Sequence, residues 1–254
     1  MAQYNRIGPY NEFETLTLKN DDYVFVLSGA GVSVESGLAT FRDGDGLWEK
    51  HRIEDVATPE AWRRDPELVW RFYSARRKQA SQVEPNAAHR ALAQMEEALQ
   101  ERFLLCTQNV DNLHERAGNK RVLHMHGELF MSRCEDPDCM RAPFSDERYY
   151  ETKQSIARCE CGARILPHIC WFGEVPFHMN AIMSALNKAT VFVTVGSSGA
   201  VYPAASFVSH VKNSKGSGPT TIYVGPEPPD NAYAFDQCRL GKATEAIPRL
   251  FSLR

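Results

Sequence analysis

Six short apolar runs that end in small or polar residues alternate with helical patterns, and this alternation most constrains the fold of the chain. The runs are residues 23–31, 103–111, 121–128, 165–173, 190–198 and 220–228. Helical patterns lie between several of them, for example at residues 86–101 and 180–189. Buried strands that alternate with helices are typical of a doubly wound parallel sheet. The sequence therefore predicts an α/β, Rossmann-like fold.

The ends of five of these runs carry residues that can bind a ligand. They are Gly29 to Gly31, Gln108 to Asp111, His126 with Gly127, Gly196 to Ser198, and Gly225 to Glu227. In an open α/β sheet, ligands bind in a crevice at the carboxyl ends of the strands. The sequence therefore predicts one large crevice site.

Length and charge narrow the functional classes. A chain of 254 residues, 43% of them hydrophobic, can form one large α/β domain with a smaller insertion. Its formal net charge of −3 argues against the basic surface that nucleic acid requires. The first residues show no apolar signal segment, and no apolar run reaches the roughly 20 residues that span a bilayer. We expect a cytoplasmic protein without nucleic-acid or membrane partners.

Two segments interrupt the alternation and predict a smaller domain. Residues 43–80 contain no strand pattern and predict a helical insertion over the crevice. Residues 129–166 hold a group of cysteines and predict a second insertion. Residues 1–42, 81–128 and 167–254 then form the Rossmann-like domain.

Four of the seven cysteines fall between residues 134 and 161, which favours a metal site in a reducing compartment over disulfides. Their spacing is Cys134-x₄-Cys139 and Cys159-x-Cys161, and a one-residue spacer makes a poor knuckle for tetrahedral zinc. Two interpretations stay open: one structural zinc held by all four cysteines, or an insert with free thiols. Cys106 and Cys170 lie in apolar runs and are predicted to be core residues.

The segment "DPELVWRFYSARRKQA", residues 65–80, predicts a helix with an unusual apolar face. Asp65 is a good N-cap and Pro66 suits the first helical position. At about 100° per residue, one side of this helix carries Val69, Phe72, Tyr73, Arg76 and Ala80. The other side carries Arg71, Ser74 and Lys78. A guanidinium in the apolar face needs a partner, and Glu54 or Asp55 could supply one.

The first glycine-rich stretch, "GAGVSVESG", follows the run at residues 23–31. Gly29 and Gly31 would let the backbone approach a pyrophosphate, and the N-terminus of a following helix would offer free N–H groups. Val34 occupies the third glycine position of the dinucleotide fingerprint. A plain tight turn is therefore the alternative to a nucleotide loop.

Several motifs in a fixed order resemble the sirtuin family of NAD-dependent protein lysine deacylases. They are "GAGVSVESG", "TFR", "TQNVD", "HGE", "PHICWFGE" and "GSSGAVYPAA", together with the cysteine insert. The resemblance extends from about residue 24 to residue 250. Among sirtuins, the chain is most similar to bacterial members that act on acidic acyl groups as well as on acetyl.

The resemblance implies a reaction. The carbonyl oxygen of an acyl-lysine attacks the NAD ribose, nicotinamide leaves, and an alkylamidate forms. His126 acts as the general base on a ribose hydroxyl, a task that suits a near-neutral pKa. Asn109 and Asp111 hold the nicotinamide amide, and Gln108 contacts the ribose. The acyl group ends on ADP-ribose, and free lysine is released.

The resemblance also implies which residues bind the ligands. The NAD contacts are Gly29, Ala30, Gly31, Ser33, Phe41, Arg42, Trp48, Gln108, Asn109, Val110, Asp111, Gly196, Ser197, Ser198, Gly225, Pro226, Glu227 and Ala243. The substrate contacts are Ala57, Tyr73, Arg76, Trp171, Phe172, Gly173, Glu174, Val201 and Tyr202. Tyr73 and Arg76 share a helix face and match the family's signature for acidic acyl groups, whose carboxylate they would bind. Ala57 is small enough to leave room for a longer acyl chain.

Three departures from the family pattern matter. Ala39 replaces a proline, and Thr40 replaces an aspartate, as is typical of members with acidic substrates. Gly225 replaces an asparagine, which should weaken binding of the adenosine. Two alternatives to deacylation remain: mono-ADP-ribosyl transfer or NAD hydrolysis at the same site, and a non-catalytic module that binds NAD or ADP-ribose.

Overall fold

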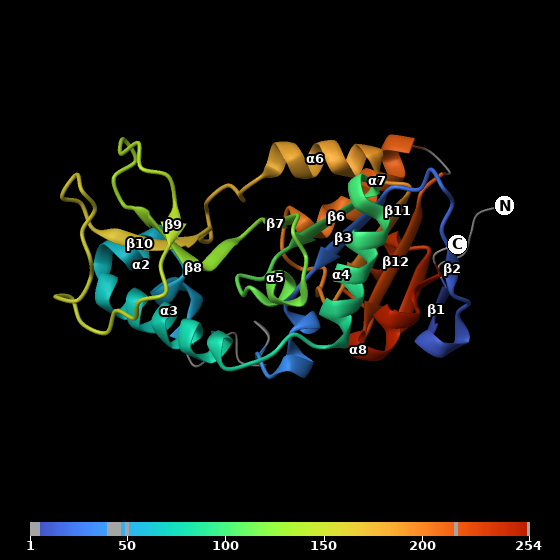
Figure 1. Cartoon of the computed structure of the whole chain (residues 1–254), viewed down its shortest axis with the longest axis horizontal. Helices are drawn as coiled ribbons and strands as arrows, with labels where there is room; N and C mark the ends of the chain where they lie inside the picture. Colours follow the sequence, from blue (N-terminus) through green and yellow to red (C-terminus); the bar gives the residue numbers. More distant parts are fainter. Residues whose placement is uncertain (1–5, 40–46, 49–50, 216–217, 253–254) are drawn as a thin grey trace.

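A parallel sheet of seven strands forms the centre of the larger part of the molecule (Figure 1). The computed structural model describes residues 6–39, 47–48, 51–215 and 218–252. In spatial order the strands are β1 (Arg6–Pro9), β13 (Gln237–Leu240), β12 (Thr220–Gly225), β11 (Val191–Val195), β3 (Val24–Ser28), β6 (Phe103–Thr107) and β7 (Val122–His124). All neighbouring pairs run parallel. The predicted α/β fold is confirmed.

Helices cover both faces of this sheet, because successive side chains of a strand point to opposite faces. Val24 and Val26 of β3 lie in one core with α4 (Ala87–Leu99) and α8 (Ala243–Ala246). Phe25 and Leu27 lie in another with α6 (Met179–Lys188) and α7 (Phe207–Lys215). The short helix α5 (Leu113–Ala117) follows β6. Among the described residues, no helix is both long and apolar enough to cross a bilayer.

A smaller part lies at the end of the molecule remote from the chain termini (Figure 1). Its antiparallel sheet has the order β10 (Ile165–Ile169), β8 (Gly127–Cys134) and β9 (Phe144–Ser145). The helices α1 (Ile53–Val56), α2 (Pro59–Arg64) and α3 (Pro66–Ser81) share a third core with β8 and β10. Both predicted insertions thus contribute to one core, while their exact bounds stay a prediction.

Local sequence signals explain where the longest helices begin. The Asp65 carboxylate accepts a hydrogen bond from the Leu68 amide at 3.0 Å, and Pro66 occupies the first turn of α3, as the N-cap rule predicts. Asn86 caps α4 and forms a reciprocal capping box with His89.

The strand pattern was wrong in three places. The run at residues 165–173 contributes β10 to the small antiparallel sheet and not to the parallel one. Segment 43–80, where no strand was expected, contains the short pair β4 (Leu47–Trp48) and β5 (His51–Arg52). The edge strand β1 and its neighbour β13 were not predicted, because both are short and carry polar residues. The two-residue strands β2 (Leu16–Thr17) and β14 (Phe251–Ser252) also pair.

Candidate active site

A crevice of about 980 Å³ opens at the carboxyl ends of β3, β6 and β11 and extends to α3 and the segment after β10. Most of the residues that the sequence singled out line it. On the NAD side these are Gly29, Ala30, Gly31, Ser33, Gln108, Asn109, Val110, Asp111, Gly196, Ser197, Ser198, Pro226 and Glu227, with His126 among them. On the acyl side they are Ala57, Tyr73, Arg76, Trp171, Phe172, Gly173, Glu174, Val201 and Tyr202.

The glycines after β3 allow two loops to touch, which sequence reasoning did not anticipate. A Cβ on Gly31 would lie 2.7 Å from the Cα of Gly196, which itself has φ +63°. The Gly31 amide donates to the Gly196 carbonyl at 2.8 Å. The expected helix after this loop is instead two short 3₁₀ turns, Ala30–Val32 and Val34–Ser36. The sequence predicted free N–H groups at the start of that helix. The Ser33 backbone amide instead donates to the Ala30 carbonyl oxygen within the first turn and is not free.

A buried hydrogen-bond network joins this loop to the segment after β6. The side-chain amide of Asn109 donates to the Ser33 hydroxyl at 3.2 Å, and that hydroxyl donates to the Asp111 carboxylate at 3.2 Å. Asp111 also accepts from the Leu113 amide at the start of α5, so it contributes to helix capping as well. Burial raises the pKa of Asp111. The network fixes both side chains at the floor of the crevice.

His126 follows β7, and its hydrogen bond defines its tautomer. Nδ1 lies 3.1 Å from the carbonyl oxygen of Gln108, which can only accept, so Nδ1 carries the proton. Nε2 is then the basic nitrogen of the neutral ring. Burial lowers the pKa of His126, and the bond to Gln108 opposes this shift. The ring is therefore neutral at physiological pH.

Three other histidines are buried behind the crevice. The rings of His89 and His114 lie 4.8 Å apart, and burial lowers the pKa of His89 to about 4. Neither faces solvent. His124 donates from Nδ1 to the Asn109 carbonyl at 3.0 Å, and its Nε2 lies 2.8 Å from a Glu115 oxygen. His124 thus supports the backbone of the segment that carries Asn109.

The acyl end of the crevice is lined by α3 and the residues after β10. The Trp171 indole donates to the Tyr73 hydroxyl at 3.1 Å, and Tyr73 is fully buried. The Arg76 guanidinium lies 4.5 Å from the centroid of the Phe72 ring. Ala57 accepts a hydrogen bond from the Phe172 amide at 3.0 Å.

The proposed acidic partners of Arg76 are paired elsewhere. Asp55 forms an ion pair with Arg64 at 2.7 Å, and Glu54 forms one with Arg52 at 3.6 Å. These pairs do not support the alternative in which Glu54 or Asp55 neutralises Arg76.

Arg77, which the helix pattern missed, is the guanidinium that α3 buries completely. It donates to the carbonyl oxygens of Leu129, Met131 and Arg148 and to the Ser132 hydroxyl, and it lies 3.6 Å from Asp146. Ser74, expected on the exposed side, is also buried and exchanges hydrogen bonds with the Tyr150 backbone. That expectation was wrong because α3 packs against β8 and β10 in addition to lining the crevice.

Among the described residues, two predicted NAD contacts, Gly225 and Ala243, do not line the crevice. Phe41, Arg42 and the Trp48 side chain lie outside the described residues, as does Thr40. Ala243 is a core residue beside α4. A Cβ on Gly225 would lie 2.1 Å from the Tyr223 hydroxyl oxygen, so Tyr223 occupies the space that a side chain would need.

The four clustered cysteines come together at one end of the small sheet. Their sulfur atoms all lie within 4.8 Å of one another, with Cys134 3.5 Å from Cys161 and Cys139 3.7 Å from Cys159. Zn–S bonds of about 2.3 Å in a tetrahedron place the sulfurs about 3.8 Å apart. Despite the irregular spacing, the cluster therefore fits a structural zinc, which would tie the end of β8 to the turn before β10.

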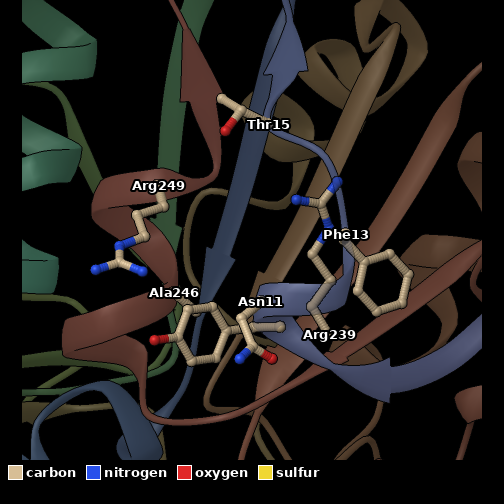
Figure 2. Close-up of a pocket in the computed structure, with 7 residues that line it drawn as sticks. Asn11, Phe13, Thr15, Arg239, Ala246 and Arg249 are labelled. Atoms are coloured by element: carbon tan, nitrogen blue, oxygen red, sulfur yellow. The ribbon is translucent and has the colours of Figure 1, made fainter.

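A separate cavity has a volume of about 120 Å³ and is lined by Tyr10, Asn11, Phe13, Thr15, Arg239, Ala246 and Arg249. Figure 2 shows it in close-up. Its buried guanidinium, Arg239, donates to the Gln237 side chain and lies over the Phe13 ring. The Tyr10 hydroxyl donates to Glu245. Since none of the predicted site residues lines this cavity, the large crevice is the candidate active site.

The sequence matches the Sir2 family over residues 29–203, more than half of the chain. The chain belongs to the Sir2 family. It is similar to the NAD-dependent protein deacylase of Shigella flexneri, with 49% identity over 227 residues that cover 89% of this chain and 81% of that protein. A Sir2 homolog–NAD complex superposes with a TM-score of 0.79 at 38% identity, covering 90% of this chain and 87% of that one. A Sir2 protein bound to an acetylated peptide gives 0.75 at 25% identity, covering 89% and 91%.

Proposed function

We propose that this Sir2 protein is an NAD-dependent protein lysine deacylase that removes acetyl, succinyl and malonyl groups. The products would be nicotinamide, O-acyl-ADP-ribose and free lysine. The observation that carries the proposal is that one crevice is lined by the glycine loops, by a neutral His126 and by Tyr73 and Arg76. NAD-side and acyl-side groups thus share one cavity.

The crevice side chains suit NAD as the second substrate, which supplies the nicotinamide leaving group and the ribose that accepts the acyl group. Asn109 and Asp111 present an amide and a carboxyl group from fixed positions, the complement of a carboxamide. Gln108 is oriented by a hydrogen bond from its amide to the Ser197 hydroxyl at 2.8 Å. Glu227 offers a carboxylate at the far side, where a ribose diol could donate.

His126 is the proposed general base. A base that is neutral at physiological pH can accept a proton from a ribose hydroxyl without first losing one. The Gln108 carbonyl holds the Nδ1 proton and so leaves Nε2 for this role. The His126 carbonyl accepts from the Cys170 amide at 2.9 Å, which fixes the backbone as well.

The acyl end is proposed to bind the carboxylate of a succinyl or malonyl group. Arg76 offers a planar fork of donors, which matches a carboxylate. The Trp171 indole donates to the Tyr73 hydroxyl and so fixes its position beside Arg76 in the crevice. Phe172 and Tyr202, 45% and 74% exposed, supply apolar surface for the peptide that carries the lysine.

Mass spectrometry tests the proposal. Acetyl-lysine and succinyl-lysine peptides are incubated with the protein and NAD, and both the peptide masses and the nucleotide products are measured. We expect loss of each acyl group and one O-acyl-ADP-ribose per lysine released. His126→Ala should lower turnover by about 10²- to 10⁴-fold while NAD still binds. Free ADP-ribose with intact acyl peptide would instead identify NAD hydrolysis, and an ADP-ribosylated protein would identify transfer.

A further inference from the structure

A continuous line of contacts runs from the cysteine cluster to the acyl end of the crevice. It begins at Glu135, the residue after Cys134, and passes through Trp62 of α2 and Trp171 to Tyr73 of α3. Only Tyr73 and Trp171 among these residues line the crevice. Glu135 and Trp62 do not line it.

Glu135 is held on both of its oxygens. Oε1 accepts from the Arg164 backbone amide at 2.9 Å, and Oε2 accepts from the Trp62 indole at 3.0 Å. The Arg164 guanidinium forms an ion pair with the same carboxylate at 2.8 Å and lies 5.1 Å from the centroid of the Trp62 ring. Trp62 is therefore fixed by a charge-assisted hydrogen bond and by a cation above its ring.

Trp62 connects Glu135 to the acyl end of the crevice through direct side-chain contacts. Its ring centroid lies 6.1 Å from that of Trp171, and the Trp171 indole donates to the Tyr73 hydroxyl. All three side chains are at least 95% buried. Close-packed interiors have little free volume to absorb a displacement, so a shift of Trp62 reaches Trp171 and then the hydroxyl.

We infer that Glu135 and Trp62 are positioning residues that set the preference for acidic over neutral acyl groups through Trp171 and Tyr73. The inference rests on the proposed carboxylate-binding role of Tyr73 and Arg76. It also implies that the order of the cysteine cluster, one residue from Glu135, affects which acyl group is removed. Acetyl-lysine has no carboxylate and does not need the oriented hydroxyl.

The chain offers a matched control. Glu160 also lies next to cluster cysteines, between Cys159 and Cys161, but its side chain is 91% exposed and its ion pair is with Arg141 at 3.6 Å. Glu135→Gln and Glu160→Gln each remove one charge beside the cluster. Glutamine replaces one of the two carboxylate oxygens with an NH₂ group, so at position 135 either the Trp62 indole or the Arg164 backbone amide would face a second donor in place of an acceptor. Trp62→Phe keeps an aromatic ring against Trp171 and removes only the indole donor.

The experiment measures kcat/KM for succinyl-lysine and acetyl-lysine peptides with saturating NAD, and melting temperature alongside. We expect the succinyl-to-acetyl ratio to fall by about 3- to 10-fold in Glu135→Gln and Trp62→Phe, mainly through KM for the succinyl peptide. Glu160→Gln should leave the ratio within about twofold of wild type. In ¹⁵N spectra, the indole N–H signal of Trp171 should move in Glu135→Gln and not in Glu160→Gln.

Three outcomes would overturn the inference, and they point to different causes. If Arg76→Met lowers the ratio but Glu135→Gln and Trp62→Phe do not, the positioning role is wrong and the proposed function stands. If Glu135→Gln and Glu160→Gln lower it equally, a general disturbance of the cysteine cluster is responsible. If Arg76→Met leaves the ratio unchanged, the carboxylate-binding part of the proposed function fails, and the inference fails with it.

Discussion

Replacing Arg77 with methionine should destabilise the protein far more than the same change at its neighbour Arg76. The Arg77 side chain is fully buried, and its guanidinium serves three backbone carbonyls, one hydroxyl and Asp146. Methionine fills a similar volume without supplying any donor. The change therefore leaves buried carbonyls of β8 without partners and removes one cation from a carboxylate that is itself buried.

The magnitude follows from these contacts. Breaking a buried ion pair by removing one partner typically costs about 3–5 kcal/mol. Arg148, Ser132 and the Tyr150 hydroxyl still bind Asp146, which places the loss toward the lower end of that range. At about 2 °C per kcal/mol for a chain of this size, a loss of about 3–4 kcal/mol should lower the melting temperature by about 6–8 °C. Arg77→Lys keeps the charge but loses the planar fork of donors. Its melting temperature should therefore lie between those of wild type and Arg77→Met.

Differential scanning calorimetry of wild type, Arg77→Met and Arg76→Met tests this directly. Arg76 lines the crevice and is half-buried, so Arg76→Met should shift the melting temperature by about 2 °C or less. A melting temperature for Arg77→Met within about 2 °C of wild type would refute the reasoning. It would mean that water or a rearranged β9 satisfies the carbonyls.

Four further predictions concern function. Arg76→Met should lower kcat/KM for succinyl-lysine by about 10- to 150-fold and change that for acetyl-lysine only a few-fold; an unchanged ratio contradicts the carboxylate role. Because burial lowers the pKa of His126 in the ligand-free protein, the acid limb of the pH–kcat/KM profile should have its midpoint below pH 6.5, and a midpoint above 6.5 contradicts a neutral base. Metal analysis should find one zinc per chain, and full activity with far less zinc argues against a structural site. Gly225→Asn should raise KM for NAD or lower stability because Tyr223 occupies the space of its side chain; a lowered KM would show that the ring moves aside.

The strands and the crevice could be predicted because both depend on patterns that are local in sequence. Buried parallel strands read as apolar runs, and their carboxyl ends meet at one edge of the sheet. The edge strand β1 and its neighbour β13 show no such run, since β1 is mostly exposed and β13 carries Gln237 and Arg239. The surroundings of Gly225 could not be predicted for a related reason: the tyrosine two residues earlier in β12 fills the space of a side chain at Gly225, and no sequence pattern shows this.

The orientation of α3 could not be predicted in full, because a helical wheel assumes one buried side. This helix packs against β8 and β10 and also lines the crevice, so Ser74 and Arg77 are buried together with Phe72 and Tyr73. The partners of Arg77 lie 52 to 71 residues away along the chain. The sequence does not show which of the two arginines is buried. The tertiary contacts show that it is Arg77.

The two adjacent arginines of α3 have different roles at the acyl end: one holds the helix in place, and the other faces the crevice. Arg77 donates a hydrogen bond to the Leu129 carbonyl of β8 and so holds α3 in place. Arg76, the residue before it, lines the crevice. His126 is held by a different set of backbone bonds, from Nδ1 to the Gln108 carbonyl and from the Cys170 amide to its own carbonyl. Because no α3 side chain takes part in those bonds, we expect a change at Arg76 to alter which acyl group binds and to leave the proposed base in place. This is why acetyl-lysine turnover should survive Arg76→Met while succinyl-lysine turnover does not.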